Sequence, residues 1–115
     1  MHELSIAMRI IEMAEEVAVR HSGRVCAVRL KVGRLSGVVK EALRSAYELA
    51  REDTKVSESA LVVEEVDVTA YCPACAAEKA IASFPELRCP TCGGPTAQVV
   101  HGRELEVVAL EIVEP

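Results

Sequence analysis

Two pairs of cysteines constrain this chain more than any other feature of its sequence. It reads Cys-Pro-Ala-Cys at residues 72–75 and Cys-Pro-Thr-Cys-Gly-Gly at residues 89–94, with thirteen residues between the pairs. Two cysteines separated by two residues can present both thiolates to one ion, and four thiolates satisfy tetrahedral zinc. We therefore predict a structural Zn²⁺ bound by Cys72, Cys75, Cys89 and Cys92, in a closed site without an open position for hydrolysis.

The residues around these cysteines are predicted to form a zinc-ribbon-like lobe inserted between two strands. Residues 72–101 hold four prolines and few large apolar side chains, so burial alone would not keep the lobe folded. Zinc binding, worth on the order of 10–16 kcal/mol, would hold it together. Gly93 follows the second pair and suits a left-handed turn, whereas Ala76 follows the first pair, at a cost of about 1 kcal/mol if the left-handed conformation is required there.

The remainder of the chain predicts an α+β domain, a small mixed three-stranded sheet with two helices on one face. Helical spacing over residues 4–21 predicts an inward face of Leu4, Ala7, Met8, Ile11, Ala14 and Ala18. The same spacing over residues 39–51 predicts an inward face of Ala42, Leu43, Ala46, Leu49 and Ala50. Glycine at Ser22-Gly23 is expected to end the first helix in a left-handed conformation.

Three strands are predicted, over residues 24–32, 61–71 and 104–112. The first alternates, with Cys26 and Val28 pointing into the core. The second changes phase near Glu64-Glu65, which we interpret as a β-bulge within one strand. We expect residues 1–70 with 103–115 to form the main α/β domain and residues 71–102 to form the zinc-binding domain.

Composition and charge exclude several classes of protein. The net charge of −5 argues against a protein that tracks nucleic-acid phosphates or an anionic membrane surface. No apolar run is long enough to span a membrane and no secretory signal is visible. The expected compartment is the cytoplasm. In that reducing environment, paired cysteines are more often metal ligands or free thiols than disulfides.

The N-terminus, Met1-His2-Glu3, offers a second constellation of metal ligands. A free α-amine, an imidazole and the unpartnered N–H groups of a helix start together form a nitrogen chelate, which suits square-planar Ni²⁺ or Cu²⁺. Glu3 would offset the positive end of the helix dipole. On this chemistry alone, a histidine at position 2 is more often an ordinary solvated terminal residue than a metal ligand.

Three blocks of sequence, in order, resemble the HypA/HybF family of nickel-insertion proteins for NiFe-hydrogenase maturation. They are the opening Met-His-Glu-Leu-Ser, the Gly-Arg-Leu-Ser-Gly-Val-Val-Lys-Glu-Ala-Leu run over residues 33–43, and the double cysteine insert. Lys40 stands where family members often have proline, and Ala76 where they often have glycine. Neither departure falls on a ligand.

The resemblance implies a nickel metallochaperone, which is not an enzyme. It implies a transient Ni²⁺ site at Met1, His2 and Glu3, using the His2 imidazole, the His2 and Glu3 backbone nitrogens and the Met1 amine. It implies structural Zn²⁺ at the four cysteines. The partners it implies are a hydrogenase maturation GTPase and the NiFe-hydrogenase large subunit, with urease maturation proteins and a second copy of the chain as further candidates.

Two other functions compete with this one. A zinc-ribbon nucleic-acid or transcription module would need a basic, aromatic surface, but residues 72–103 offer only Lys79, Arg88 and Arg103, with Phe84 as their aromatic residue. A thiol–disulfide redox protein would use one Cys-x-x-Cys pair as a reactive dithiol. His21 is expected in the last turn of the first helix, where a positive charge is favourable. His101 is expected on the surface near the lobe.

Overall fold

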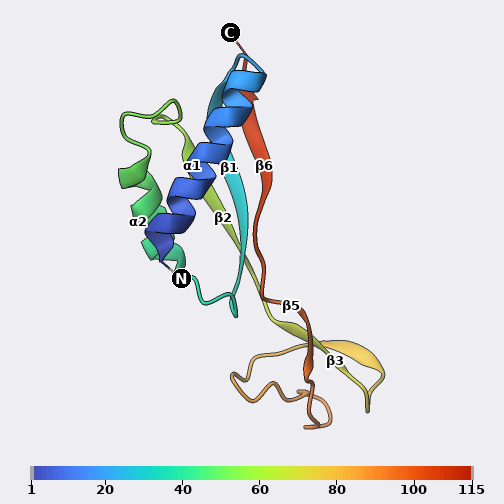
Figure 1. Ribbon diagram of the computed structural model, residues 1–115. Helices are drawn as coiled ribbons and strands as arrows, with labels where there is room; N and C mark the ends of the chain where they lie inside the picture. Colours follow the sequence, from blue (N-terminus) through green and yellow to red (C-terminus); the bar gives the residue numbers. More distant parts are fainter. Residues whose placement is uncertain (1, 115) are drawn as a thin grey trace. The chain divides into compact units, whose positions relative to one another are not determined.

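The computed structural model describes residues 2–114 and confirms the α+β class, with two helices and two three-stranded sheets (Figure 1). One sheet has the order β2-β1-β6 and the other the order β4-β3-β5. The helices are α1 (Glu3–Arg20) and α2 (Lys40–Ala50). The strands are β1 (Arg24–Gly33), β2 (Ala60–Val66), β3 (Thr69–Cys72), β4 (Ala77–Ala80), β5 (Gln98–His101) and β6 (Leu105–Val113).

The described residues divide between two compact units. Unit 1 takes in the chain up to Lys31, Gly37–Glu64 and the chain from Glu106 onward. Unit 2 consists of Val32–Ser36 and Glu65–Leu105. The turn after β1 therefore belongs with the cysteine-bearing segment, although the two are far apart in the sequence.

Backbone hydrogen bonds explain why that turn belongs to unit 2. The Gly33 N–H donates to the Glu104 carbonyl at 2.7 Å, and the Leu35 N–H donates to the Gly102 carbonyl at 2.6 Å. A Cβ on residue 33 would lie 2.1 Å from the Gly102 oxygen, which is far inside van der Waals contact. Glycine is required at position 33 because the two backbones touch.

In unit 1, Figure 1 shows α1 and α2 side by side on one face of the β2-β1-β6 sheet. The prediction for α1 is partly wrong, since Leu4 and Met8 are 52% and 56% exposed. Ile6 and Ile10 take their place, because the apolar stripe of α1 is wider than one face and the helix turns its isoleucines to the sheet. The buried residues of α1 are Ile6, Ala7, Ile10, Ile11, Ala14 and Ala18.

At the end of α1, the residue in the left-handed conformation is not the predicted one. Ser22 carries the positive φ of 51°, and the Gly23 N–H donates to the Ala18 carbonyl at 3.1 Å, as in a Schellman motif. A Cβ on Gly23 would lie 2.5 Å from Cγ2 of Ile112. Glycine is needed there for close packing against β6.

Helix α2 buries Leu43 and Tyr47. The expected inward positions Ala42 and Leu49 are exposed, Leu49 by 71%, and this part of the prediction is wrong. The prediction rests on the spacing of aliphatic residues and therefore misses Tyr47. The Tyr47 side chain is fully buried, and its hydroxyl is hydrogen-bonded to Ser59 Oγ. That bond ties the helix to the loop before β2.

The single strand expected over residues 61–71 is also wrong. It is two strands, β2 and β3, which belong to different sheets. The phase change at Glu64-Glu65 is present, because both side chains are exposed in succession, and the chain then leaves the first sheet after Val66. Cys26 is only partly buried, since Ala27 and Val28 in β1 are both buried and the alternation shifts there.

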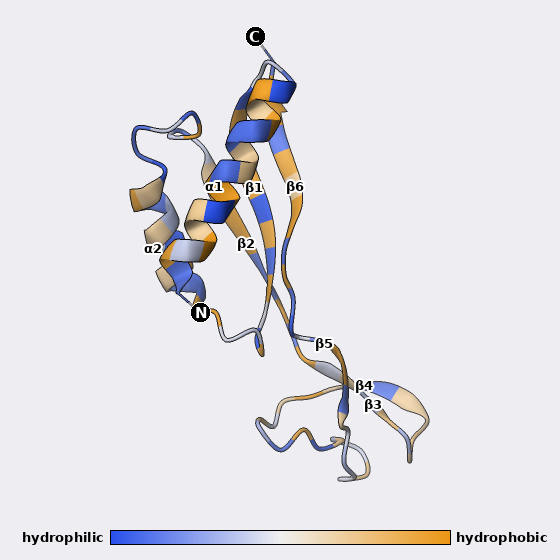
Figure 2. Ribbon diagram, viewed as in Figure 1, coloured by the Kyte–Doolittle hydropathy of each residue, from blue (hydrophilic) through white to orange (hydrophobic). Residues whose placement is uncertain are grey.

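Figure 2 shows hydrophobic residues recurring along α1, β1, β2 and β6, whereas the long connections of unit 2 are mostly pale with a few blue and orange residues. Unit 2 has a small apolar core of Val68, Ala70 and Ile81, with Leu35 and Leu87 packed against it. Neither described helix is long and apolar enough to cross a bilayer.

Replacing the buried tyrosine tests the tie between α2 and the loop. Tyr47→Phe should lower the free energy of unfolding by about 1–2 kcal/mol, because Ser59 Oγ loses a buried hydrogen-bond partner. Tyr71→Phe is the matched control, since Tyr71 is 37% exposed, and it should change stability by less than about 0.5 kcal/mol. Urea unfolding of both variants measures the difference, and equal effects would contradict the assignment.

Candidate metal centres

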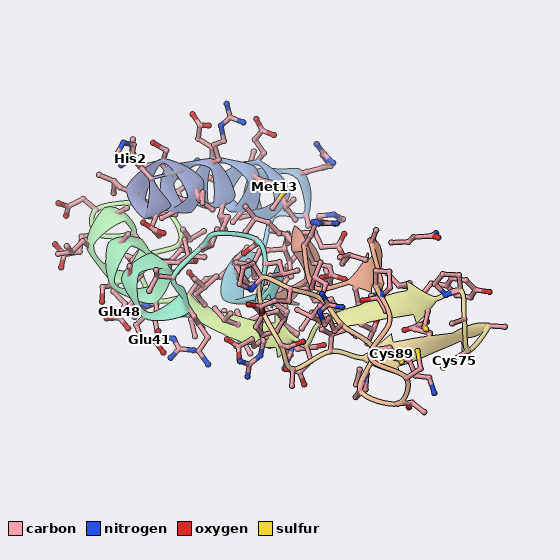
Figure 3. All side chains as sticks on the ribbon, turned by 90° about the horizontal axis from the view of Figure 1, so that it is seen from below. His2, Met13, Glu41, Glu48, Cys75 and Cys89 are labelled. Carbon is pink, nitrogen blue, oxygen red and sulfur yellow. The ribbon has the colours of Figure 1, made fainter. Side chains whose placement is uncertain are left out.

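The four predicted cysteines converge on one point in unit 2. Their sulfur atoms all lie within 4.8 Å of one another, and they form the one such metal-ligating cluster found among residues 2–114. Sγ of Cys72 lies 3.5 Å from Sγ of Cys92, and Sγ of Cys75 lies 3.9 Å from Sγ of Cys89. Figure 3 labels Cys75 and Cys89, one from each sequence pair.

These distances fit a tetrahedral tetrathiolate ion. With zinc–sulfur bonds of about 2.3 Å, sulfurs at the corners of a tetrahedron lie roughly 3.8 Å apart. Both of these contacts join a cysteine of the first pair to one of the second, so neither pair stands alone as a dithiol. The donor set and its spacing therefore suit a structural zinc ion better than a redox couple.

Local backbone structure places the first pair. Cys72 ends β3 and pairs with Ala77 at the start of antiparallel β4, so the pair forms the hairpin turn. The Cys75 N–H points at Sγ of Cys72, 3.4 Å away. Ala76 takes the left-handed conformation with φ of 53°, so the cost expected for alanine in that conformation applies here.

The second pair is held by a separate loop between β4 and β5. The Gly93 N–H donates to the Cys89 carbonyl and the Cys89 N–H donates to the Gly94 carbonyl, both at 2.9 Å. The Gly94 N–H lies 3.4 Å from Sγ of Cys92. Gly93 has φ of 74°, as expected, and backbone N–H groups aimed at sulfur stabilise thiolates.

The thiols differ in acidity without a metal ion. The backbone N–H of Cys92 lowers the pKa of the Cys89 thiol to about 6. The neighbouring thiols of Cys92 and Cys72 raise the pKa of the Cys75 thiol to about 12, because several thiolates cannot share so small a volume. A divalent cation would remove that repulsion and displace the Cys75 proton.

His101 lies on the surface of unit 2, as predicted, with its Nδ1 3.2 Å from a carboxylate oxygen of Glu104. The Gly102 N–H donates to the other oxygen of Glu104 at 2.7 Å. Burial alone would raise the pKa of Glu104, but the backbone N–H groups of Glu104 and Gly102, together with His101, lower it. Glu104 was not singled out from the sequence, where nothing local marks it.

The second candidate centre is the start of α1, in unit 1. His2 is the N-cap residue, with extended φ and ψ of −82° and 125°, and its exposed side chain makes no capping hydrogen bond. Figure 3 shows this side chain projecting from the first turn. The His2 carbonyl accepts the Ile6 N–H at 3.3 Å, so the N–H groups of Glu3, Leu4 and Ser5 precede the helical ladder.

Glu3 is half-buried and its carboxylate is engaged. Oε2 of Glu3 accepts the backbone N–H of Val39, the N-cap residue of α2, at 3.2 Å. This hydrogen bond is the main cause that lowers the pKa of Glu3. Met1, the third predicted nickel ligand, lies outside the described residues.

Comparison with known proteins points to one family. The family model described as "Hydrogenase/urease nickel incorporation, metallochaperone, hypA" matches residues 1–112. Hydrogenase maturation factors HypA from Chloroflexus aurantiacus and Streptomyces avermitilis are 46% and 42% identical, each over 96% of this chain and over 98% and 86% of the relative.

Two solved structures share the fold. The solution structure of a HypA protein matches with a TM-score of 0.74, over 100% of this chain and 98% of that chain. The solution structure of the Ni metallochaperone HypA from Helicobacter pylori matches with a TM-score of 0.66, over the full length of both chains. Both are 24% identical to this chain, so these two matches support the fold alone.

The acidity of the cysteines predicts how zinc affinity depends on pH. Cys75, with its pKa raised to about 12, must lose a proton to bind zinc, so affinity should fall at least about tenfold per pH unit on acidification from pH 8 to 6.5. Cys89, with its pKa lowered to about 6, adds a further dependence only below that value. Competition with a chelator measures this, and a constant affinity from pH 8 to 6.5 would contradict it.

The two left-handed positions predict opposite effects of exchanging glycine and alanine. Ala76→Gly should stabilise the zinc-loaded protein by up to about 1 kcal/mol, because glycine removes the strain of a positive φ. Gly93→Ala should destabilise it by a similar amount; a Cβ there meets nothing within 4 Å, so the effect is one of backbone conformation. Denaturant unfolding with zinc present measures both, and changes of the same sign would contradict the assignment.

Proposed function

Because this chain belongs to the HypA family of hydrogenase/urease nickel-incorporation metallochaperones, we propose that its N-terminus binds Ni²⁺ and delivers it to the NiFe-hydrogenase large subunit. The observation that carries the proposal is the start of α1. There an exposed histidine stands outside the helix and is followed at once by N–H groups that precede the helical ladder.

In this proposal nickel is cargo and the ligands are nitrogens. His2 provides its imidazole and its backbone nitrogen, Glu3 provides its backbone nitrogen, and the Met1 amine completes a square. Metal-bound, deprotonated amides would break no helical hydrogen bond, because these N–H groups have no acceptor within α1. Their negative charge offsets Ni²⁺ at the positive end of the helix dipole.

A terminal site of this kind suits transfer. The His2 side chain is exposed, so a partner can reach the ion and replace ligands one at a time. Affinity by itself would favour Cu²⁺ over Ni²⁺. In this proposal, selectivity for nickel comes from the partners and from which metal ion is available. The protein acts as a carrier and catalyses no reaction.

The cysteine cluster is proposed as the resident zinc site, with Cys72, Cys75, Cys89 and Cys92 as ligands. Zinc bound there would cross-link the β3–β4 hairpin to the loop of residues 89–94 and supply stability that the small core lacks. We further propose residues 71–102 as the zinc-binding domain and residues 1–70 with 103–115 as the nickel-binding domain.

The proposed partners are a hydrogenase maturation GTPase and the hydrogenase large subunit, in the cytoplasm. Urease maturation proteins are included because the family description names urease as well, and self-association remains a further proposal. The rival functions have less support, because the chain carries a net charge of −5 and all four cysteines converge on one point.

Nickel titration of three variants tests the terminal site. His2→Ala should weaken Ni²⁺ binding more than about 100-fold, since even loss of an outer-shell partner of a metal ligand costs roughly 10–100-fold. Three residues added before Met1 should also weaken binding, because they carry the α-amine away from His2. The matched control is His21→Ala, which removes another exposed histidine of unit 1 and should leave binding unchanged.

Calorimetry measures the nickel affinity in each titration, and the absorption band of the bound ion is recorded with it. Native affinity and an unchanged band in both His2→Ala and the extended chain would contradict the terminal site. An equal loss in His21→Ala would show that exposed histidines bind nickel without regard to position.

A further inference from the structure

The carboxylate of Glu3 joins the start of α1 to the start of α2. Its Oε2 accepts the Val39 N–H at 3.2 Å across 36 positions of sequence. Both residues belong to unit 1. A first-turn glutamate in a helix would ordinarily be explained by the dipole of its own helix, but this one serves a neighbouring helix.

Val39 has a free donor for this contact. As N-cap of α2, it accepts the Leu43 N–H with its carbonyl at 3.0 Å, while its own N–H lies outside the helical ladder. Its apolar side chain makes no capping hydrogen bond. Glu3 thus provides, from another helix, a carboxylate at the N-terminus of α2, where negative charge is favourable.

The same residue carries a proposed nickel ligand in its backbone. The directions of the His2 and Glu3 nitrogens depend on the dihedral angles of residues 2 and 3. Those residues are at the N-terminal end of α1, where helices fray, and ordering them costs conformational entropy. A tertiary hydrogen bond from the Glu3 side chain limits fraying before any metal arrives.

We propose that Glu3 is a positioning residue for the terminal metal site, in which its carboxylate, anchored on Val39 N–H, holds the backbone nitrogens ready for Ni²⁺. This inference rests on the proposed function. It separates two roles of Glu3, since the backbone nitrogen binds the ion and the side chain binds the protein. The carboxylate is therefore not a nickel ligand.

The coupling must also act in reverse, because a contact that favours nickel binding is favoured by it. Bound Ni²⁺ fixes residue 3, so the Glu3–Val39 hydrogen bond should be populated more fully. Nickel should then slow amide hydrogen exchange at Val39, which donates no bond within α2 and depends on Glu3 for its acceptor. Amide hydrogen exchange at the start of α2 should therefore show whether nickel is bound at the terminal site.

The first test compares two Glu3 variants by Ni²⁺ titration. Glu3→Ala should weaken binding about three- to tenfold, the range expected for one hydrogen bond. Glu3→Gln should restore most of the affinity, because its amide oxygen can accept the same N–H. Glu12→Ala, which removes an exposed glutamate elsewhere on α1, is the control and should bind like the native chain.

A double-mutant cycle tests the partner. Val39→Pro removes the donor and leaves residues 1–3 untouched, and the φ of −87° at residue 39 is near the range of proline. It should weaken nickel binding as Glu3→Ala does, and the double variant should be no weaker than either single variant. Circular dichroism confirms folding; if Val39→Pro does not fold, hydrogen exchange at Val39 in native protein and Glu3→Ala decides.

The outcomes separate this inference from the proposed function. Equal affinities of native protein, Glu3→Ala and Glu3→Gln, with no effect of nickel on Val39 exchange, would overturn the inference alone, provided that His2→Ala still loses nickel. Equal losses in Glu3→Gln and Glu3→Ala would also overturn it, since they would indicate that the carboxylate acts through its charge or as a ligand. If His2→Ala binds as tightly as native protein, the proposed function itself fails.

Discussion

The convergence of four sulfur atoms on one point is the constraint on which unit 2 depends. Its buried apolar core consists of three small or medium side chains, too few to order the long connections around them. The first cysteine pair closes the β3–β4 hairpin and the second closes its own loop, so one tetrahedral ion would join both. A strained residue such as Ala76 would be tolerated because such an ion would over-determine the backbone around it.

The start of α1 presents a different chemistry from the cysteine cluster. Four soft ligands in a closed shell retain an ion, whereas exposed nitrogens at a chain end can take up an ion and release it. The two candidate centres lie in different compact units. A structural ion at the cysteines and a transferable ion at the start of α1 would therefore not compete for the same ligands. The contact between Glu3 and Val39 leaves the imidazole of His2 exposed.

What the sequence predicts well here is local chemistry. Cysteine spacing, the left-handed position at Ala76 and the extent of both helices depend on a few neighbouring residues, and the structure agrees with them. Which face of α1 is buried depends on the sheet it meets, so the choice between Met8 and Ile10 could not be made from spacing. The break between β2 and β3 was hidden because β-branched residues continue across it.

Long-range contacts account for the remaining errors and omissions. Nothing near Gly33 in the sequence indicates that it touches the Gly102 backbone, and nothing near Glu3 indicates Val39 as its partner. Such pairs need the fold before they can be recognised. They also change the interpretation of the family-like blocks, since the turn of residues 33–36 belongs to the compact unit that holds the cysteines.

The central claim is that two ions occupy two chemically distinct sites in one chain. X-ray absorption at the nickel and zinc edges, on native protein loaded with one equivalent of each ion, tests it most directly. We predict nickel surrounded only by nitrogen and oxygen, and zinc surrounded by four sulfurs at about 2.3 Å. Sulfur in the nickel shell, or zinc with fewer than four sulfur neighbours, would contradict the account.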